Sequence, residues 1–319
     1  MTWSAGKSAA QVRTPEVLDA IALYLNLLKR TLTRLAFEVA PSSTATENVK
    51  PAWTTVGLRK RFGPAYVAIV RRLPFKKLLA RVADRFRRTL EARLPIDYAA
   101  RYEGRDWPAS AETMIGMKRL DNLQTCIERV LQDEIPGDLI ETGVWRGGAT
   151  IFMRGVLAAH NVRDRVVFVA DSFEGLPPPD ARRAPADAGD IHWTFANLAV
   201  SLDEVRRNFE RYGLLDDRVS FLKGWFRDTL PTAPIQRLAI LRLDGDMYES
   251  TMDALDALYP KLSPGGYAIV DDYGAVEGCR RAVHDYRERH GIDEPIETID
   301  WTGVFWRKNP AGHHPGLNP

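Results

Sequence analysis

The sequence predicts an α/β protein with a Rossmann-like, mostly parallel sheet covered by helices on both faces. Two observations carry this prediction. Five short apolar runs follow one another between residues 137 and 272, and most of them end in glycine or an acidic residue. The segments between these runs place apolar residues at helical spacing. Strands that alternate with helices in this way build βα units, and βα units build a parallel sheet.

The N-terminal part of the chain is expected to be a helical extension. Helical spacing over 15–40 is followed by a Pro/Ser/Thr-rich linker near 41–53, and 66–93 form a basic amphipathic pattern. Residues 1–93 hold 18 Lys and Arg against 6 Asp and Glu, although the whole chain has a net charge of only +2. We therefore predict a basic extension over 1–93 and a larger α/β domain over 94–319. The basic pattern could contact an anionic membrane or a partner, but such a stripe more often packs on its own domain.

The elements of the larger domain follow in order. A helix is expected over about 113–133. The predicted strands are 137–143, 165–171, 218–224, 237–244 and 266–272. The predicted helices are 147–160, 201–212, 249–262 and 275–290. The aromatic alternation of 297–308 indicates one or two closing strands. Residues 176–200 are too long and proline-rich for a simple βα loop, so we interpret them as a lid beside the ligand edge.

The composition is that of an ordinary globular protein, with 45% hydrophobic and 27% charged residues among 319. The cysteines, Cys126 and Cys279, lie in helical patterns without metal-ligand spacing and are expected to be buried thiols. This usage fits a reducing cytoplasm. The N-terminus lacks a secretory pattern, and its longest uncharged apolar stretch, 20–28, is much shorter than a membrane span. We expect a cytoplasmic protein without stable membrane insertion.

Two acidic clusters are the most informative chemical feature. Asp244 and Asp246 follow one apolar strand, and Asp271 and Asp272 follow the next. Neighbouring parallel strands end at the same edge of a sheet, so these carboxylates should converge on one crevice. Converging carboxylates repel unless a cation or a proton intervenes. Oxygen ligands alone suit a hard ion such as Mg²⁺, so the clusters predict a metal-assisted enzyme.

A glycine-rich turn and a second acidic residue predict a cofactor on the same edge. The first strand ends in the turn 141–148 (ETGVWRGG), whose glycine spacing differs from the dinucleotide motif. The turn is similar to that of S-adenosylmethionine (AdoMet)-dependent methyltransferases, although a tight turn without a ligand is the alternative. Asp171 ends the second strand, where it could accept hydrogen bonds from a ribose or cap a helix. The third strand ends in 224–226 (GWF), which could lie against an adenine or pack in the core.

Four segments together resemble the macrocin O-methyltransferase family. They are 111–122 (AETMIGMKRLDN), 141–155 (ETGVWRGGATIFMRG), 170–179 (ADSFEGLPPP) and 241–274, which includes LRLDGDMYEST and GYAIVDDYG. The resemblance covers roughly 98–308 and leaves the basic extension outside. It implies a class I methyltransferase fold and a Mg²⁺-dependent transfer of the AdoMet methyl group to a deoxysugar hydroxyl on a macrolide or related antibiotic.

The resemblance also implies roles for individual residues. The metal would be bound by Asp244, Asp271 and Asp272, with Asp244 also acting as the general base. The cofactor would be bound by Glu141, Gly143, Asp171 and the closing segment Thr113, Met114, Ile115 and Gly116. The neighbouring turn residues Thr142, Trp145, Ser172, Gly224, Trp225 and Phe226 complete the candidate cofactor site. The role of Asp246 stays open between supporting the metal ligands and holding the turn.

The acceptor side is less defined. His192, next to Trp193 in the lid, is a second candidate base, although a single loop histidine is more often structural. Tyr102, Asp106 and Trp107 could line the acceptor pocket from the other side. Tyr248 and Tyr273 follow the acidic clusters and could border the site or pack in the core.

Three other functions are compatible with parts of the sequence. The acceptor could be a catechol-like or other non-sugar diol, or the protein could be a non-catalytic AdoMet-binding scaffold. The intact acidic clusters argue against the scaffold. Nucleic acid is disfavoured because the part beyond residue 93 is net acidic and would repel phosphates. We expect a glycosylated small molecule as the partner and a homo-oligomeric assembly.

Overall fold

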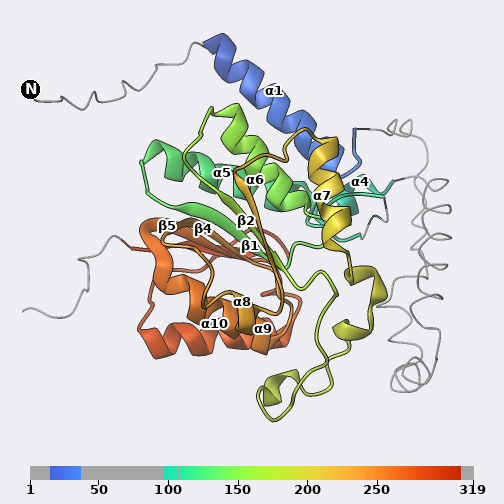
Figure 1. Ribbon diagram of the computed structural model, residues 1–319, viewed down its shortest axis with the longest axis vertical. Helices are drawn as coiled ribbons and strands as arrows, with labels where there is room; N and C mark the ends of the chain where they lie inside the picture. Colours follow the sequence, from blue (N-terminus) through green and yellow to red (C-terminus); the bar gives the residue numbers. More distant parts are fainter. Residues whose placement is uncertain (1–14, 37–95, 107, 109, 310–319) are drawn as a thin grey trace, which may run out of the picture.

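The computed structural model describes residues 15–36, 96–106, 108 and 110–309 (Figure 1). The predicted linker near 41–53, the basic pattern over 66–93 and Trp107 lie outside the described residues. The boundary at residue 93 therefore stays a prediction.

A seven-stranded sheet forms the centre of the molecule, and it confirms the predicted fold class. Its strands are β1 (Asp138–Thr142), β2 (Val167–Asp171), β3 (Val219–Lys223), β4 (Leu238–Leu243), β5 (Leu262–Val270), β6 (Glu297–Thr298) and β7 (Val304–Arg307). They lie in the order β3-β2-β1-β4-β5-β7-β6. The first five are parallel, and β7 runs antiparallel to β5 and to β6. Each predicted strand is present, and the tail forms the two closing strands.

Helices cover both faces of the sheet (Figure 1). On one face lie α1 (Pro15–Leu32), α5 (Gly116–Gln132), α6 (Gly148–Ala159) and α7 (Leu202–Arg211). On the other lie α8 (Phe226–Thr229), α9 (Tyr248–Leu258) and α10 (Glu277–His290). The short α4 (Tyr98–Tyr102) precedes α5. Each face has its own buried apolar cluster, because the parallel strands are apolar on both sides.

The element boundaries differ from the predictions in a few places. β5 begins at Leu262, four residues before the predicted Gly266, and α5 begins at Gly116 rather than at Thr113. Gly116 has a left-handed backbone (φ 73°), and its α-carbon faces the backbone of Gly104 so closely that an added Cβ would lie 2.3 Å from Gly104 N. The helix therefore cannot extend backwards through this glycine. The short helices α4 and α8 were not predicted.

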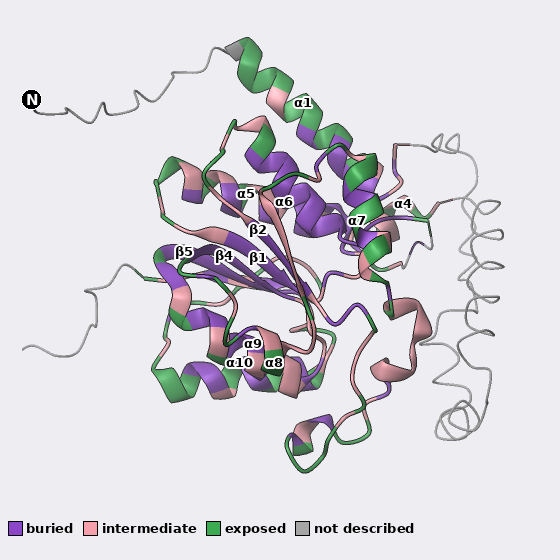
Figure 2. Ribbon diagram, in the orientation of Figure 1, coloured by how far each residue is buried: buried purple, intermediate pink, exposed green. Residues whose placement is uncertain are grey.

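Helix α1 packs into the core of the α/β domain. Leu25, Leu28 and Leu32 are buried in the cluster that also contains α5 and α6. Gly155 of α6 allows this close approach, because a Cβ there would lie 2.4 Å from a methyl carbon of Leu28. The outer face of α1 remains exposed, with the Leu23 residue 73% accessible (Figure 2). The predicted extension thus begins with a helix that stabilises the domain directly.

Within the described part of the chain, no helix combines the length and apolar character that a membrane crossing needs.

Candidate active site

The predicted cofactor turn and acidic clusters meet at one edge of the sheet. The backbone ladder continues one residue beyond the strands, with Gly143 N donating to Ala170 O (2.8 Å), Asp244 N to Thr142 O (2.9 Å) and Asp271 N to Leu243 O (2.9 Å). Gly143, Asp244 and Asp271 therefore lie side by side after β1, β4 and β5. The strand order reverses between β1 and β4, because β2 and β3 follow on one side of β1 whereas β4 and β5 follow on the other. Open α/β sheets bind ligands at such a switch point.

The glycine turn approaches both the acidic loop and the predicted cofactor-closing segment. Gly143 has a φ of 86°, and a Cβ on it would lie 1.7 Å from Asp244 O. At the start of α6, a Cβ on Gly148 would lie 2.5 Å from the side chain of Thr113. Gly148 N also donates to Glu112 O (3.1 Å). A larger residue at either glycine would push apart segments that must lie side by side in the predicted site.

The three predicted metal ligands converge. Asp244, Asp271 and Asp272 each offer an oxygen, and these three atoms all lie within 4.8 Å of one another. Asp246 does not belong to this group. Its backbone is left-handed (φ 59°), and its N–H donates to Asp272 Oδ2 (3.0 Å). The backbone of Asp246 thus connects its turn to Asp272, and the role of its carboxylate stays open.

A buried arginine that we did not predict as a site residue lies inside the cluster. Arg242 projects from β4, and its guanidinium hydrogen-bonds to Glu141, Asp244 and Asp271. The distance from Nη1 to Asp244 Oδ2 is 2.7 Å. The signal for this residue was present in the sequence, because a charged residue within the buried run LAILRL requires a buried partner.

A second buried arginine connects the cluster to two other segments. Arg119 of α5 donates to the remaining oxygen of Asp271, to Asp300 Oδ2 (2.9 Å) and to Gly104 O (3.2 Å). Asp300 is itself fixed by the backbone N–H groups of the turn before β7. Both oxygens of Asp271 are thus held by arginines, one from each side.

Burial dominates the pKa values of the acids around these arginines. Burial raises the pKa of Glu141 to about 8. Burial and the charge of Asp271 raise the pKa of Asp244 to about 7. Burial also raises the pKa of Asp272 well above its usual range, with further increases from Asp246 and Asp244. Burial thus favours the neutral forms of these carboxyl groups, and the charge of Arg242 opposes it at Glu141 and Asp244.

Asp171, the predicted ribose ligand, ends β2 beside the glycine turn. Its two oxygens accept hydrogen bonds from Val144 N (2.8 Å) and Phe173 N (2.7 Å), so its carboxylate connects the glycine turn to the end of β2. Gly224 N donates to Asp171 O (2.9 Å), which places the third-strand segment alongside. Phe226 reaches the acidic loop, since a Cβ on Gly245 would lie 3.4 Å from its ring.

Other predicted cofactor residues have local partners. Trp145 donates from its indole to Asn197 O (2.9 Å), so its ring contacts the lid segment. Ser172 donates to Gly175 O (2.6 Å) in its own turn. Thr142 and Ile115 are buried, whereas Met114 and Trp225 are partly exposed. The structure thus brings the predicted segments together without testing which side chains contact the cofactor.

The lid segment brings His192 close to the acidic loop. The imidazole Nδ1 lies 2.7 Å from Asp190 Oδ2. Burial raises the pKa of Asp246 to about 6, and the nearby charge of His192 opposes this rise. Trp193, also in the lid, is partly exposed.

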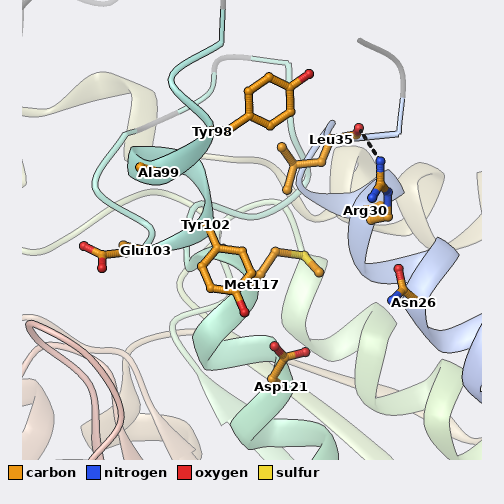
Figure 3. A pocket seen from close by; sticks show the side chains of 9 residues that line it. All are labelled: Asn26, Arg30, Leu35, Tyr98, Ala99, Tyr102, Glu103, Met117 and Asp121. Carbon is orange, nitrogen blue, oxygen red and sulfur yellow. Dashed lines mark hydrogen bonds between the residues drawn. The ribbon is translucent and has the colours of Figure 1, made fainter. Parts of the chain in front are cut away.

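Tyr102 and Asp106, predicted for the opposite acceptor wall, lie in and just after α4. Tyr102 lines a cavity of 590 Å³ between α1, α4 and α5 (Figure 3), and none of the acidic-cluster residues line this cavity. Asp106 pairs with Arg101. The hydroxyl of Tyr248 bonds to Asp285 and that of Tyr273 to His284, so both point towards α10 rather than the cluster.

The residues present fit a divalent cation and AdoMet. Among the hydrogen bonds of the described residues, none involves Oδ1 of Asp244 or of Asp272. The excess of carboxylates over guanidinium groups also favours an added cation. On the cofactor side, Glu141 Oε2 is buried without a hydrogen-bond partner, next to the glycine turn. An orphaned buried acceptor at this position suits a ligand with a donor group.

Comparison with known proteins identifies relatives of this chain. The chain is 50% identical over 294 residues to the 8-demethyl-8-(2,3-dimethoxy-alpha-L-rhamnosyl)-tetracenomycin-C 4'-O-methyltransferase of Streptomyces olivaceus, covering 92% of this chain and 95% of that protein. It is 58% identical over 213 residues to the mycinamicin III 3''-O-methyltransferase of Micromonospora griseorubida, covering 66% of this chain and 84% of that protein.

A solved structure agrees with the sequence relatives. The O-methyltransferase NovP superposes with a TM-score of 0.71 at 43% identity, covering 91% of this chain and 99% of NovP. The family model for macrocin O-methyltransferase matches residues 21–308, so it also includes most of α1, which we had placed outside the resemblance. The chain belongs to the macrocin O-methyltransferase family and is an AdoMet-dependent O-methyltransferase.

Proposed function

We propose that this enzyme transfers the methyl group of AdoMet to a deoxysugar hydroxyl of a glycosylated natural product, in a reaction that requires Mg²⁺. One observation carries the metal dependence. Asp244, Asp271 and Asp272 offer oxygen atoms within 4.8 Å of one another, beside the glycine turn that would hold the cofactor. Three carboxylates that converge in this way without a metal would face strong mutual repulsion.

The chemistry explains why a cation would be useful. A sugar hydroxyl is neutral at pH 7 and is a poor nucleophile. When bound, AdoMet supplies an electrophilic methyl group, and a divalent cation supplies acidification and orientation of the hydroxyl. Asp244, whose backbone packs against Gly143 of the cofactor turn, would accept the hydroxyl proton. No covalent intermediate with the protein is needed.

The remaining residues would position these groups. Arg242 fixes the carboxylates of Glu141, Asp244 and Asp271 relative to one another. Glu141 and Asp171 would hold the polar ends of the cofactor. His192 would lie on the acceptor side, with Asp190 fixing the orientation of its ring.

The sugar acceptor is inferred from the relatives. One of them is named as the 4'-O-methyltransferase of a rhamnosyl-tetracenomycin. The other is named as the 3''-O-methyltransferase of mycinamicin III. The proposal extends this class of substrate to the present chain. It also includes a cytoplasmic location, which the buried thiols of Cys126 and Cys279 support, and a homo-oligomer, which the exposed leucines of α1 support.

The test is methyl transfer from labelled AdoMet to a panel of glycosylated polyketides, with and without chelator. Excess EDTA should abolish turnover, and added Mg²⁺ should restore it. Asp272→Asn should reduce turnover by about 100-fold or more while AdoMet binding by calorimetry stays within about twofold, because electrostatic stabilisation of a reacting group is lost. Asp217→Asn, an 80% exposed carboxylate, is the matched control. Undiminished activity in excess EDTA would contradict the metal dependence.

A further inference from the structure

The lid segment 176–200 contains a buried carboxylate that none of the assigned roles uses. Asp187 is only 3% exposed and ends the short 3₁₀ turn Pro185–Asp187. A carboxylate is rarely buried in a loop unless specific donors satisfy it. The partners of Asp187 therefore indicate what the middle of the lid is attached to.

Asp187 caps a helix that belongs to another part of the chain. Its Oδ1 accepts the backbone N–H of Tyr248 (2.7 Å) and its Oδ2 that of Glu249 (2.9 Å). These are the first two residues of α9, and the N-cap residue Met247 provides no side-chain hydrogen bond. The first N–H groups of a helix have no partner within the helix, and its dipole favours a negative charge there. The lid thus supplies the cap that the sequence of α9 lacks.

The surroundings of Asp187 are shaped for this contact. Gly278, near the start of α10, leaves room for the carboxylate, because a Cβ there would lie 2.9 Å from Asp187 Oδ1. Four residues earlier in the lid, Arg183 pairs with Glu249 (3.0 Å). The lid is therefore fixed to α9 at two points, and α9 begins only two residues after Asp246.

A continuous set of hydrogen bonds leads from Asp187 to His192. Asp190 N donates to Asp187 O (3.0 Å), which closes a turn. The carboxylate of Asp190 then accepts the backbone N–H of His192 (2.7 Å) and lies 2.7 Å from its ring Nδ1. The charge of His192 also lowers the pKa of Asp246 in the acidic loop. The cap on α9 and the position of the imidazole are therefore parts of one connected arrangement.

We propose that Asp187 is a positioning residue: by capping α9 from the lid, it holds Asp190 and His192 against the acidic loop in the arrangement needed for methyl transfer to the acceptor. This inference rests on the proposed function of the same site. Among the described residues, the carboxylate of Asp187 accepts hydrogen bonds from α9 and from neither the cluster nor the glycine turn. Its removal should therefore affect the reaction through His192 while the cofactor side stays intact.

The kinetic test compares Asp187→Ala, Asp187→Asn and a control. Asp187→Ala should lower kcat for the acceptor by about 10- to 100-fold, since displacement of a catalytic group by about 1 Å can cost this much. The KM and Kd for AdoMet should stay within about twofold. Asp187→Asn keeps one acceptor oxygen for the helix N-terminus and should recover part of the loss. Asp180→Ala removes an exposed carboxylate that caps only Arg182 N in the same lid, and it should leave kcat unchanged.

A double-mutant cycle tests whether the effect passes through the histidine. If Asp187 acts by positioning His192, the variant Asp187→Ala/His192→Ala should have the kcat of His192→Ala alone. Trypsin should also cleave after Arg182 or Arg183 at least several-fold faster in Asp187→Ala than in the wild type, because the lid loses one of its two attachments.

The outcomes separate this inference from the proposed function. A normal kcat for Asp187→Ala, with only a lower melting temperature, would show that the cap stabilises the fold and does nothing more. Effects of the two substitutions that multiply independently would also overturn the inference. In both cases the wild type still methylates its sugar acceptor. A wild-type enzyme that methylates no glycosylated acceptor would instead refute the proposed function.

Discussion

The arginine inside the acidic cluster allows a quantitative prediction. In Arg242→Met, an uncharged side chain of similar length replaces a guanidinium whose side chain is only 1% exposed. The substitution preserves much of the apolar packing along β4. It leaves Glu141, Asp244 and Asp271 without the cation that they share.

The expected loss of stability follows from this geometry. Removing one partner of a buried ion pair costs about 3–5 kcal/mol, because the remaining charge is buried without compensation. A domain of this size loses about 2–4 °C in Tm for each kcal/mol. The Tm of Arg242→Met should therefore fall by roughly 6–20 °C.

The assay is thermal unfolding with and without Mg²⁺. A ligand that binds only the native state stabilises it by RT ln(1 + [L]/Kd). Because Arg242 and the proposed cation share the carboxylates of Asp244 and Asp271, Mg²⁺ should raise the Tm of Arg242→Met more than that of the wild type. Arg165→Met is the matched control. Arg165 is partly buried and donates to the carbonyl oxygens of Ile135 (2.7 Å) and Gly137 (3.0 Å), so its loss should cost about 1–2 kcal/mol without any dependence on Mg²⁺.

Two results would refute this reasoning. Arg242→Met could unfold within 1–2 °C of the wild type, or Mg²⁺ could stabilise neither protein. If the methionine variant does not fold, Arg242→Lys provides the same test with a smaller perturbation. Lysine keeps the charge but cannot form the guanidinium fork, so an intermediate loss of about 1–3 kcal/mol is expected.

Three further predictions test other parts of the molecule. Asp171→Ala should weaken AdoMet binding about 10- to 100-fold in calorimetry, since hydrogen bonds to a charged group contribute about 1.5–3 kcal/mol; Asp138→Asn, which changes a carboxylate at the opposite end of the sheet, should leave binding unchanged. Leu32→Ala should lower the free energy of unfolding in urea by about 2–5 kcal/mol because the side chain is fully buried, whereas Leu27→Ala, at a residue 60% exposed on the same helix, should change it by less than about 0.5 kcal/mol. Burial raises the pKa of Cys126 to about 12, so the native enzyme should not react with a thiol reagent at pH 8 or 9. Both cysteines should react once the enzyme is unfolded. Rapid labelling of the native enzyme would contradict the burial of the thiols.

The fold was predictable because its signals are local and repeated. Each parallel strand is a short apolar run that ends in glycine or a polar residue, and each intervening helix has apolar residues at helical spacing. The convergence of Asp244 with Asp271 followed from topology alone, since adjacent parallel strands end at the same edge. The close contact of Gly143 with Asp244 O has the same origin, because these residues follow the adjacent parallel strands β1 and β4.

The parts of the site that were not predicted depend on contacts between distant segments. Arg119 lies 152 residues before Asp271, and nothing in the helical pattern of α5 shows which buried group it binds. The cap that Asp187 gives to α9 joins residues 61 and 62 positions apart. Side-chain partners of this kind are fixed by the packed tertiary structure, which the spacing of residues along one segment does not describe.

The distribution of charge in the cluster explains how a cation site and a buried arginine can coexist. Arg242 and Arg119 each donate to one oxygen of Asp271, and Arg242 also donates to Oδ2 of Asp244. The Oδ1 atoms of Asp244 and Asp272 form no hydrogen bond among the described residues. Burial is the main cause of the raised pKa values of Asp244 and Asp272, and a cation bound beside them would favour their charged forms. The arginines thus fix the carboxylates in place, and the Oδ1 atoms of Asp244 and Asp272 are the ones that a divalent cation would bind.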